Sequence, residues 1–151
     1  ELPVYTRLGD TRETALTWGR IADILYQRGE YEEATSLQLK RLETNTGLGD
    51  LDGIAAANWD LATIHLAQQD HESAAPRLIE SYTILRRLRR ADGLAVVALT
   101  LASLLAAADR IPEAQHVAGE GLQSATKIGA SDLVEQLTNL LDNLSQGNDE
   151  R

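Results

Sequence analysis

The amino-acid sequence repeats itself with a period of forty residues, and this period limits the fold more than any other feature. When the chain is shifted by one period, small residues stay aligned at three places in each copy. The aligned alanines are Ala15, Ala22 and Ala34, then Ala55, Ala62 and Ala74, then Ala95, Ala102 and Ala114. Periods of about 20–50 residues are typical of stacked supersecondary units. We therefore expect an array of similar units.

Each period contains two helical patterns. Apolar residues from Trp18 to Leu25 recur at the i, i+3, i+4 and i+7 spacing of one helix face. A break around Gly29 follows, and a second periodic run extends from Tyr31 to Leu42. The alanines twelve residues apart, such as Ala22 and Ala34, would let the two helices approach closely, because a larger side chain would hold the backbones apart. Each unit is therefore predicted to be a helical hairpin.

Local signals mark the expected helix starts. Asp10 and Glu13 have the spacing of a capping box, and Asp50 and Asp70 stand where an N-cap carboxylate would accept backbone N–H groups. Pro112 suits a first helical position. The predicted organisation is a remnant of a preceding repeat at 1–10, repeats at 11–50, 51–90 and 91–130, a capping helix at 131–145 and a disordered tail at 146–151.

Composition narrows the class of protein. The chain has 151 residues, 14 Lys and Arg against 23 Asp and Glu, and a formal charge of -9. It contains no cysteine, which excludes disulfides, thiolate zinc sites and cysteine nucleophiles. No apolar run reaches the roughly 18 residues that span a bilayer. Because methionine is absent even at position 1, we expect a piece of a longer protein, and we expect it in the cytoplasm.

The hairpin pattern resembles the tetratricopeptide repeat. The residues that carry the resemblance are Trp18, Ile21, Ala22, Leu25, Gly29, Tyr31 and Ala34. The forty-residue period is similar to that of Pins/LGN-type scaffolds, kinesin light chains and the sensor ends of bacterial STAND-type regulators. In the third repeat Asp109-Arg110-Ile111 replaces Gly29-Glu30-Tyr31, so the match weakens there. The resemblance implies an all-α, right-handed superhelical array of hairpins, whose first helices line the inner wall.

A binding groove on that inner wall is the main functional expectation. The stripe is mostly apolar, with a few polar side chains, and Trp59 is expected to be a rigid aromatic anchor at its centre. The alternative for Trp59 is packing against the next repeat. The predicted groove residues are Leu16, Gly19, Arg20, Asp23, Tyr26, Ala56, Trp59, Asp60, Thr63, Leu66, Val96, Leu99, Ser103 and Ala106.

The basic stretch Leu85–Arg90, which reads LRRLRR, falls at the end of a second helix. Cations are favoured at a helix C-terminus by about 0.3–1 kcal/mol. A nucleic-acid surface would extend the positive charge to the neighbouring junctions, yet these carry Asp10 and Asp50. We interpret the stretch as a solvated helix end, and docking of an acidic protein partner stays open as the alternative.

No other motif supports catalysis or a cofactor. Gly47–Gly53 comes close to a dinucleotide fingerprint, but it follows a helix and repeats the Leu-Gly-Asp junction, so it reads as a helix-ending turn. His65, His71 and His116 lack partners at the spacing of a ligand pair. We predict no catalytic residue, no metal site and no cofactor.

The predicted function is a non-enzymatic interaction module that binds a peptide or helical segment, as the scaffold or sensor part of a larger signalling regulator. Nucleic acid and membrane are not expected partners. Two alternatives stay open. One is structural assembly, with self-association through the array ends at Leu2 or Leu141. The other is a small-molecule sensor domain, which would need an enclosed pocket.

Overall fold

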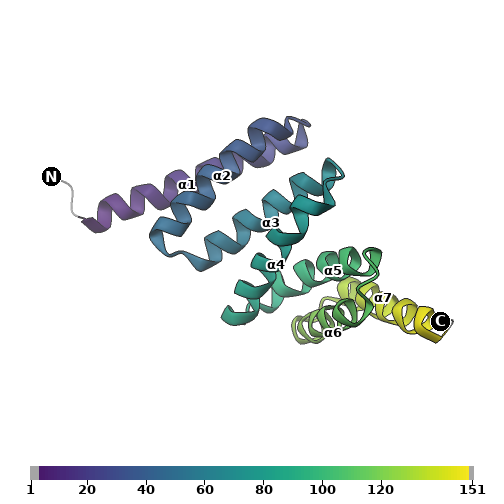
Figure 1. Ribbon diagram of the computed structural model, residues 1–151. Coiled ribbons are helices and arrows are strands. Elements are labelled where there is room, and N and C mark those ends of the chain that lie inside the picture. Colours follow the sequence, from purple (N-terminus) through teal and green to yellow (C-terminus); the bar gives the residue numbers. More distant parts are fainter. Residues whose placement is uncertain (1–3, 150–151) are drawn as a thin grey trace. The chain divides into compact units, whose positions relative to one another are not determined.

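The computed structural model describes residues 4–149, and their side chains from residue 9 to residue 147. The described residues form helices and turns, with no strand among them. The helices are α1 (Val4–Gln27), α2 (Tyr31–Leu48), α3 (Leu51–Ala67), α4 (His71–Leu88), α5 (Ala91–Ala107), α6 (Ile111–Ile128) and α7 (Ser131–Asp149) (Figure 1). None of these helices is both long and apolar enough to cross a membrane. The all-α class and the helical repeats are confirmed.

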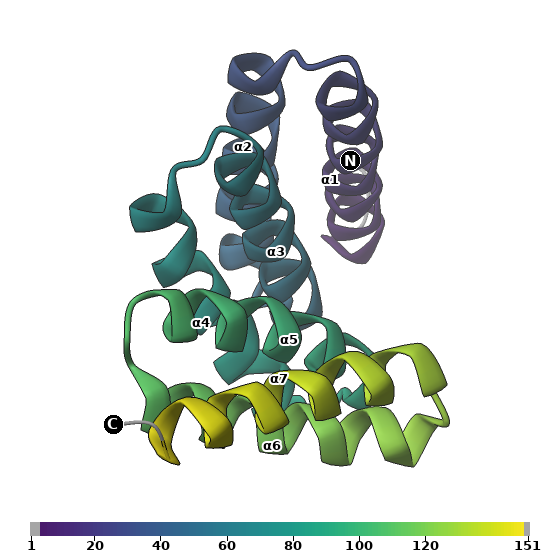
Figure 2. The same cartoon turned by 90° about the vertical axis from the view of Figure 1, so that its right-hand side faces the viewer.

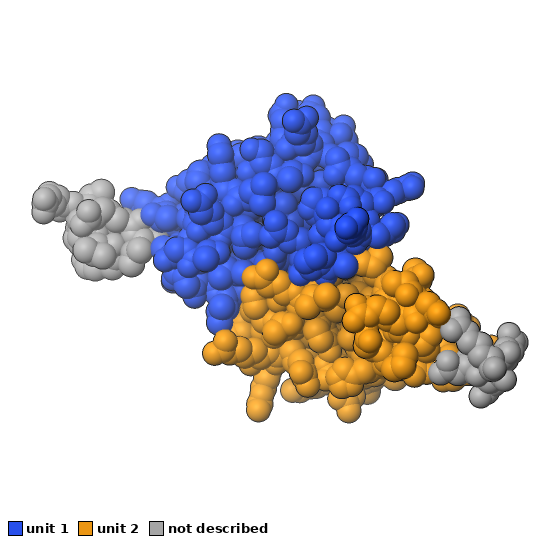
Figure 3. Space-filling model, in the orientation of Figure 1, with its two compact units in different colours: residues 1–77 blue, residues 78–151 orange. Residues whose placement is uncertain are grey.

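The chain divides into two compact units, residues 1–77 and residues 78–151, with the boundary inside α4 (Figure 3). In the first unit α2 packs against both α1 and α3. In the second unit α6 packs against α5, and α7 packs against both of them (Figure 2). Each unit therefore has its own helix-on-helix core.

The aligned alanines form the centre of these cores. All nine are at most 2% exposed, as expected for positions where neighbouring helices approach too closely for a larger side chain. Large apolar side chains fill the remaining space, with Leu61 and Ile64 buried in the first unit and Leu101 and Leu137 in the second. The predicted packing role of the alanines is confirmed.

Each turn between helices contains one residue in the left-handed region, and these residues follow one another every twenty positions. Three are glycines, Gly29, Gly49 and Gly129, and three carry side chains, Gln69, Arg89 and Asp109. The caps agree with the prediction, since Asp50 Oδ1 accepts from Gly53 N at 3.1 Å and Asp70 Oδ1 accepts from Ser73 N at 3.1 Å. The turn geometry thus persists where the glycine is lost.

Replacing Gln69 with glycine is expected to raise the free energy of unfolding by up to about 1 kcal/mol. The left-handed conformation costs a residue with a Cβ atom roughly 1–2 kcal/mol, and the greater chain entropy of glycine offsets about half of that gain. Urea unfolding followed by circular dichroism measures the change. The matched variant in the opposite direction is Gly29→Ala, which puts a Cβ atom on a residue in the left-handed region. The φ angle is +78° at Gly29, and nothing lies within 4 Å of the added Cβ atom, so the variant changes the backbone strain without a steric clash. If Gln69→Gly lowers the free energy of unfolding instead, then the left-handed conformation of Gln69 does not strain the turn.

Two predicted helix boundaries are wrong. Helix α1 continues through Gly9 and Asp10, and Thr14 Oγ1 donates to Asp10 O at 2.9 Å as in a helix interior, so Asp10 is not an N-cap and residues 4–10 are not a separate remnant. Residues 4–10 continue the backbone hydrogen bonds of α1, since each further residue of an existing helix adds one such bond. At the other end α7 extends to Asp149, beyond the expected end at residue 145 and into the tail predicted to be disordered. Leu2 and residues 150–151 lie outside the described part.

Candidate functional site

A partly buried polar network joins α2 to α3 in the first unit. Asp60 Oδ2 accepts from Arg41 Nη1 at 2.9 Å and from Gln38 Nε2 at 3.3 Å, and Arg41 Nη1 also donates to Gln38 Oε1 at 3.2 Å. Gln38 is buried, and the Arg41 side chain is only 12% exposed. The network therefore fixes the position of the Asp60 carboxylate at the surface of α3.

Gly19 of α1 makes room for this network. A Cβ atom at Gly19 would lie 3.1 Å from the Arg41 guanidinium group, closer than ordinary contact. The missing side chain allows the guanidinium to lie against the α1 backbone while it binds Asp60. Gly19 was predicted to face a ligand, and in the structure it faces the side chain of Arg41.

The pKa of the Asp60 carboxyl is raised above its ordinary value of 3.8. Burial is the largest cause, and the negative charge of Asp23 adds to it, whereas the charge and hydrogen bond of Arg41 lower the pKa. The positive charge of Arg41 therefore does not fully compensate the burial of Asp60 and the nearby negative charge of Asp23.

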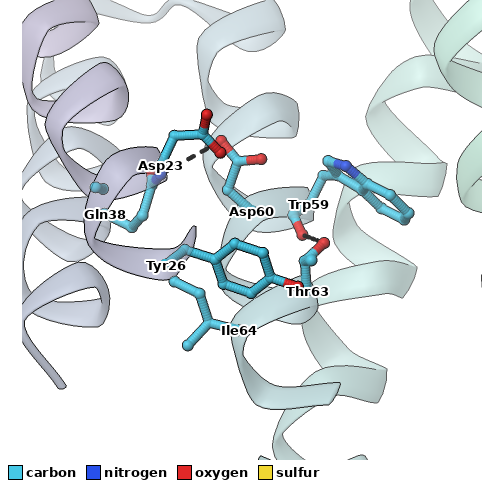
Figure 4. Close-up of a pocket in the computed structure, with 8 residues that line it drawn as sticks. Asp23, Tyr26, Gln38, Trp59, Asp60, Thr63 and Ile64 are labelled. Carbon is cyan, nitrogen blue, oxygen red and sulfur yellow. Dashed lines mark hydrogen bonds between the residues drawn. The ribbon is translucent and has the colours of Figure 1, made fainter. Parts of the chain in front are cut away.

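A pocket of about 190 Å³ lies beside the network. Its lining comes from α1, α2 and α3, and consists of Ala22, Asp23, Tyr26, Gln38, Trp59, Asp60, Thr63 and Ile64. In Figure 4 the carboxyl groups of Asp23 and Asp60 lie at one end of the pocket, and the Tyr26 ring lies between them and Thr63. The Trp59 indole points away from both carboxyl groups. Thr63 Oγ1 donates to Trp59 O at 2.9 Å, which holds its oxygen in place.

The structure brings together five of the predicted groove residues, Asp23, Tyr26, Trp59, Asp60 and Thr63, in this pocket. The remaining predicted residues lie outside it. In the first unit Leu16 is 53% exposed, Arg20 is exposed, and Gly19, Ala56 and Leu66 are half-buried. In the second unit α5 carries Val96, Leu99, Ser103 and Ala106, which are exposed or half-buried.

As pocket residues, sequence reasoning missed Ala22, Gln38, Ile64 and the supporting residue Arg41. The repeat register contained a signal for two of them. Gln38 aligns with Leu78 of the next repeat, which is buried and apolar, so a glutamine at this position needs a buried polar partner. Arg41 aligns with Gly121 two repeats later. A long polar side chain where another repeat has glycine indicates a local specialisation of the first unit.

The basic stretch of α4 is tied to α6 in the second unit. Arg86 Nη2 lies 3.0 Å from Glu120 Oε1, and His116 Nε2 lies 3.2 Å from the same oxygen. The Tyr82 hydroxyl donates to Glu120 Oε2, and burial together with this carboxylate raises the Tyr82 pKa. Glu120 therefore neutralises part of the arginine charge, which favours the interpretation of this stretch as a solvated helix end.

Two other hollows lie in the second unit, and neither gathers metal ligands. One of about 450 Å³ is largely apolar and is lined by Ile79, Tyr82, Thr83, Leu101, Leu105, Arg110, Pro112, Glu113, His116 and Val117. One of about 230 Å³ is lined by Arg86, Arg89, Ala91, Leu94, Gln123, Ser124 and Lys127. Within residues 4–149, no three His, Cys, Asp or Glu side chains are placed to hold a metal ion.

Asp60 is expected to lower the stability of the folded chain as the pH rises. Its folded-state pKa lies above 3.8, so between 3.8 and that raised pKa the folded chain binds more protons than the unfolded chain, and the free energy of unfolding falls with pH. The Asp60→Asn variant lacks this titrating group. The free energy of unfolding of the native chain, relative to that of the variant, should therefore be highest below pH 3.8 and fall as the pH rises. Urea unfolding of both chains at about pH 3 and about pH 6 measures the difference. An advantage that grows with pH would mean that Arg41 outweighs burial.

Comparison with known proteins agrees with this architecture. Residues 13–86 match the sequence model described as tetratricopeptide repeat. A search of curated protein sequences finds no relative of the chain. Among solved structures, aspartyl phosphate phosphatase F from Bacillus subtilis aligns with a TM-score of 0.83 at 15% identity, over 99% of this chain and 38% of that one.

Two further structures are similar. BtubC (BKLC) from P. vanneervenii aligns with a TM-score of 0.61 at 18% identity, over 87% of this chain and 62% of that one. A putative kinesin light chain of Podospora anserina, described as having nearly identical TPR-like repeats, aligns with a TM-score of 0.60 at 17% identity, over 99% of this chain and 78% of that one. At these identities the structures bear on the fold alone. Residues 13–86 are therefore identified by sequence as tetratricopeptide repeats, and the similar structures support a helical-repeat fold for the chain.

Proposed function

We propose that the chain is a non-enzymatic interaction module that binds a peptide or helical segment of another protein at the pocket on α1 and α3. Tetratricopeptide-type folds generally mediate protein–protein interaction. The observation that carries the proposal is the pocket itself, where an aromatic ring, a fixed carboxylate and a hydroxyl surround an accessible space of about 190 Å³. Because Gln38 and Arg41 already hold the Asp60 carboxylate and Trp59 O holds the Thr63 hydroxyl, binding does not need to order these two groups.

The size of the pocket argues against a small-molecule sensor at this place. Drug-sized ligands occupy pockets of roughly 300–1,000 Å³, whereas this one measures about 190 Å³. It can accept a single side chain of a longer ligand. This chain covers only 38% of the length of the phosphatase, so the activity of the phosphatase is not carried over to it. The chain is proposed to be the scaffold or sensor part of a larger cytoplasmic regulator.

Selection from a displayed library of random peptides tests the proposal. The chain has two tryptophans, so the Trp18→Phe variant leaves Trp59 as the only indole. We expect selected peptides to bind with micromolar affinity and to change the fluorescence of Trp59 on binding. A library without binders, or binders that leave Trp59 fluorescence unchanged, would contradict binding at this pocket. Sedimentation of the same chain tests self-association, for which the predicted contact Leu141 is half-buried.

A further inference from the structure

The pocket of the first unit offers hydrogen-bond acceptors with a surplus of negative charge. Asp23 comes from α1 and Asp60 from α3, and their carboxyl groups lie at one end of the pocket (Figure 4). Arg41 is the cation bound to Asp60, at 2.9 Å. Asp23 Oδ2 accepts a hydrogen bond from the neutral amide of Gln27, at 3.4 Å. The two carboxylates thus outnumber the bound cation Arg41, and a ligand that brings positive charge would relieve their repulsion.

The walls of the pocket restrict the shape of that ligand. Tyr26 and Thr63 also line the pocket, and the Tyr26 ring lies between the two carboxyl groups and Thr63 (Figure 4). Carboxylates only accept hydrogen bonds, so the ligand must donate them. A guanidinium group has five donors in one plane, can bridge two carboxylates and stacks on an aromatic ring, whereas an ammonium group is a compact point charge.

We propose that this pocket receives an arginine side chain of the bound peptide, held between the carboxylates of Asp23 and Asp60 and against the Tyr26 ring. The inference rests on the proposed function, because it names the chemistry of the partner at the same site. The cavity measures about 190 Å³, which is enough for one extended side chain. The formal charge of -9 favours the approach of a basic partner.

The amide of N-acetyl-arginine is the probe that tests the arginine pocket without any peptide. Titration into the 15N-labelled chain should give saturable chemical-shift changes at Asp23, Tyr26, Asp60 and Thr63. The neutral isostere N-acetyl-citrulline amide should give none, and the lysine analogue should bind more weakly. Affinity for the arginine amide should fall about fivefold to tenfold in Asp23→Asn, because one of the two charges facing the ligand is lost.

Glu43→Gln provides the matched control, since it removes the same charge from an exposed position on α2 outside the pocket and should leave the affinity unchanged. Absence of shifts at the pocket, equal binding of citrulline amide, equal binding of the lysine analogue, or an unchanged affinity in Asp23→Asn would each overturn the arginine assignment. The peptide selection separates this failure from failure of the proposed function. Peptides that alter Trp59 fluorescence but keep their affinity when every arginine is replaced by citrulline would leave groove binding intact and contradict the arginine pocket.

Discussion

Replacing Thr63 with arginine is expected to weaken binding of the selected peptides by at least about 30-fold, which corresponds to roughly 2 kcal/mol. Thr63 lies in the pocket wall on α3, and its side chain is half-buried. A longer side chain at this position would fill the space that the ligand needs. Its guanidinium group could also reach Asp23 and Asp60, and would then occupy the proposed arginine pocket from within the chain. Fluorescence anisotropy of a labelled peptide measures the loss.

The matched control for this variant is Thr46→Arg on α2. Thr46 has the same kind of hydrogen bond as Thr63, from its hydroxyl to the carbonyl four residues earlier, but it is exposed and lies outside the pocket. Both variants should give the circular dichroism spectrum of the native chain. Equal affinities for the two variants would show that the peptide binds elsewhere.

Truncation of Leu137 to alanine is expected to destabilise the second unit by about 2–5 kcal/mol, the usual cost of such a change at a fully buried site. Leu137 is 0% exposed on α7. A Cβ atom at Gly121 of α6 would lie 3.3 Å from Leu137 Cδ2, so the leucine packs directly over this glycine. Its loss leaves a cavity between α6 and α7 that the helix backbones cannot close without moving.

Thr138→Ala on the same helix is the control, since Thr138 is exposed and the change should alter stability by less than about 0.5 kcal/mol. Urea unfolding followed by circular dichroism gives both values. If Leu137→Ala costs no more than the control, then α7 does not contribute to the core of the second unit. In that case the role of a capping helix, which covers the apolar end of an array, would have to be given up.

The repeat architecture was predictable because its signals are local and recur. The alanines at forty-residue spacing identify where helices touch, and all of them are buried. Capping by Asp50 and Asp70 was predictable for the same reason, since an N-cap depends on residues within one turn. The five pocket residues that were predicted all lie on first helices, where the helical period determines which side chains share a face.

The remaining features depend on contacts between distant residues. Gly9 and Gly49 occupy the same register position, yet only Gly49 takes the left-handed conformation and ends a helix, at the junction from α2 to α3. The role of Gly19 could not be read from its neighbours, because the guanidinium group that covers it belongs to Arg41 on the next helix. Such pairings are visible only once the helices are placed in space.

Photo-crosslinking from the pocket tests the central proposal most directly. Benzoylphenylalanine is incorporated in place of Tyr26, which preserves an aromatic ring in the pocket wall, and in a second chain in place of Leu39, which is 44% exposed on α2. A third chain carries it in place of Ile79, which lines the apolar hollow of the second unit and is 45% exposed. If the peptide binds at the pocket, a selected peptide crosslinks from position 26 and not from positions 39 or 79. Crosslinking from position 39 or 79 with none from position 26 would contradict binding at the pocket.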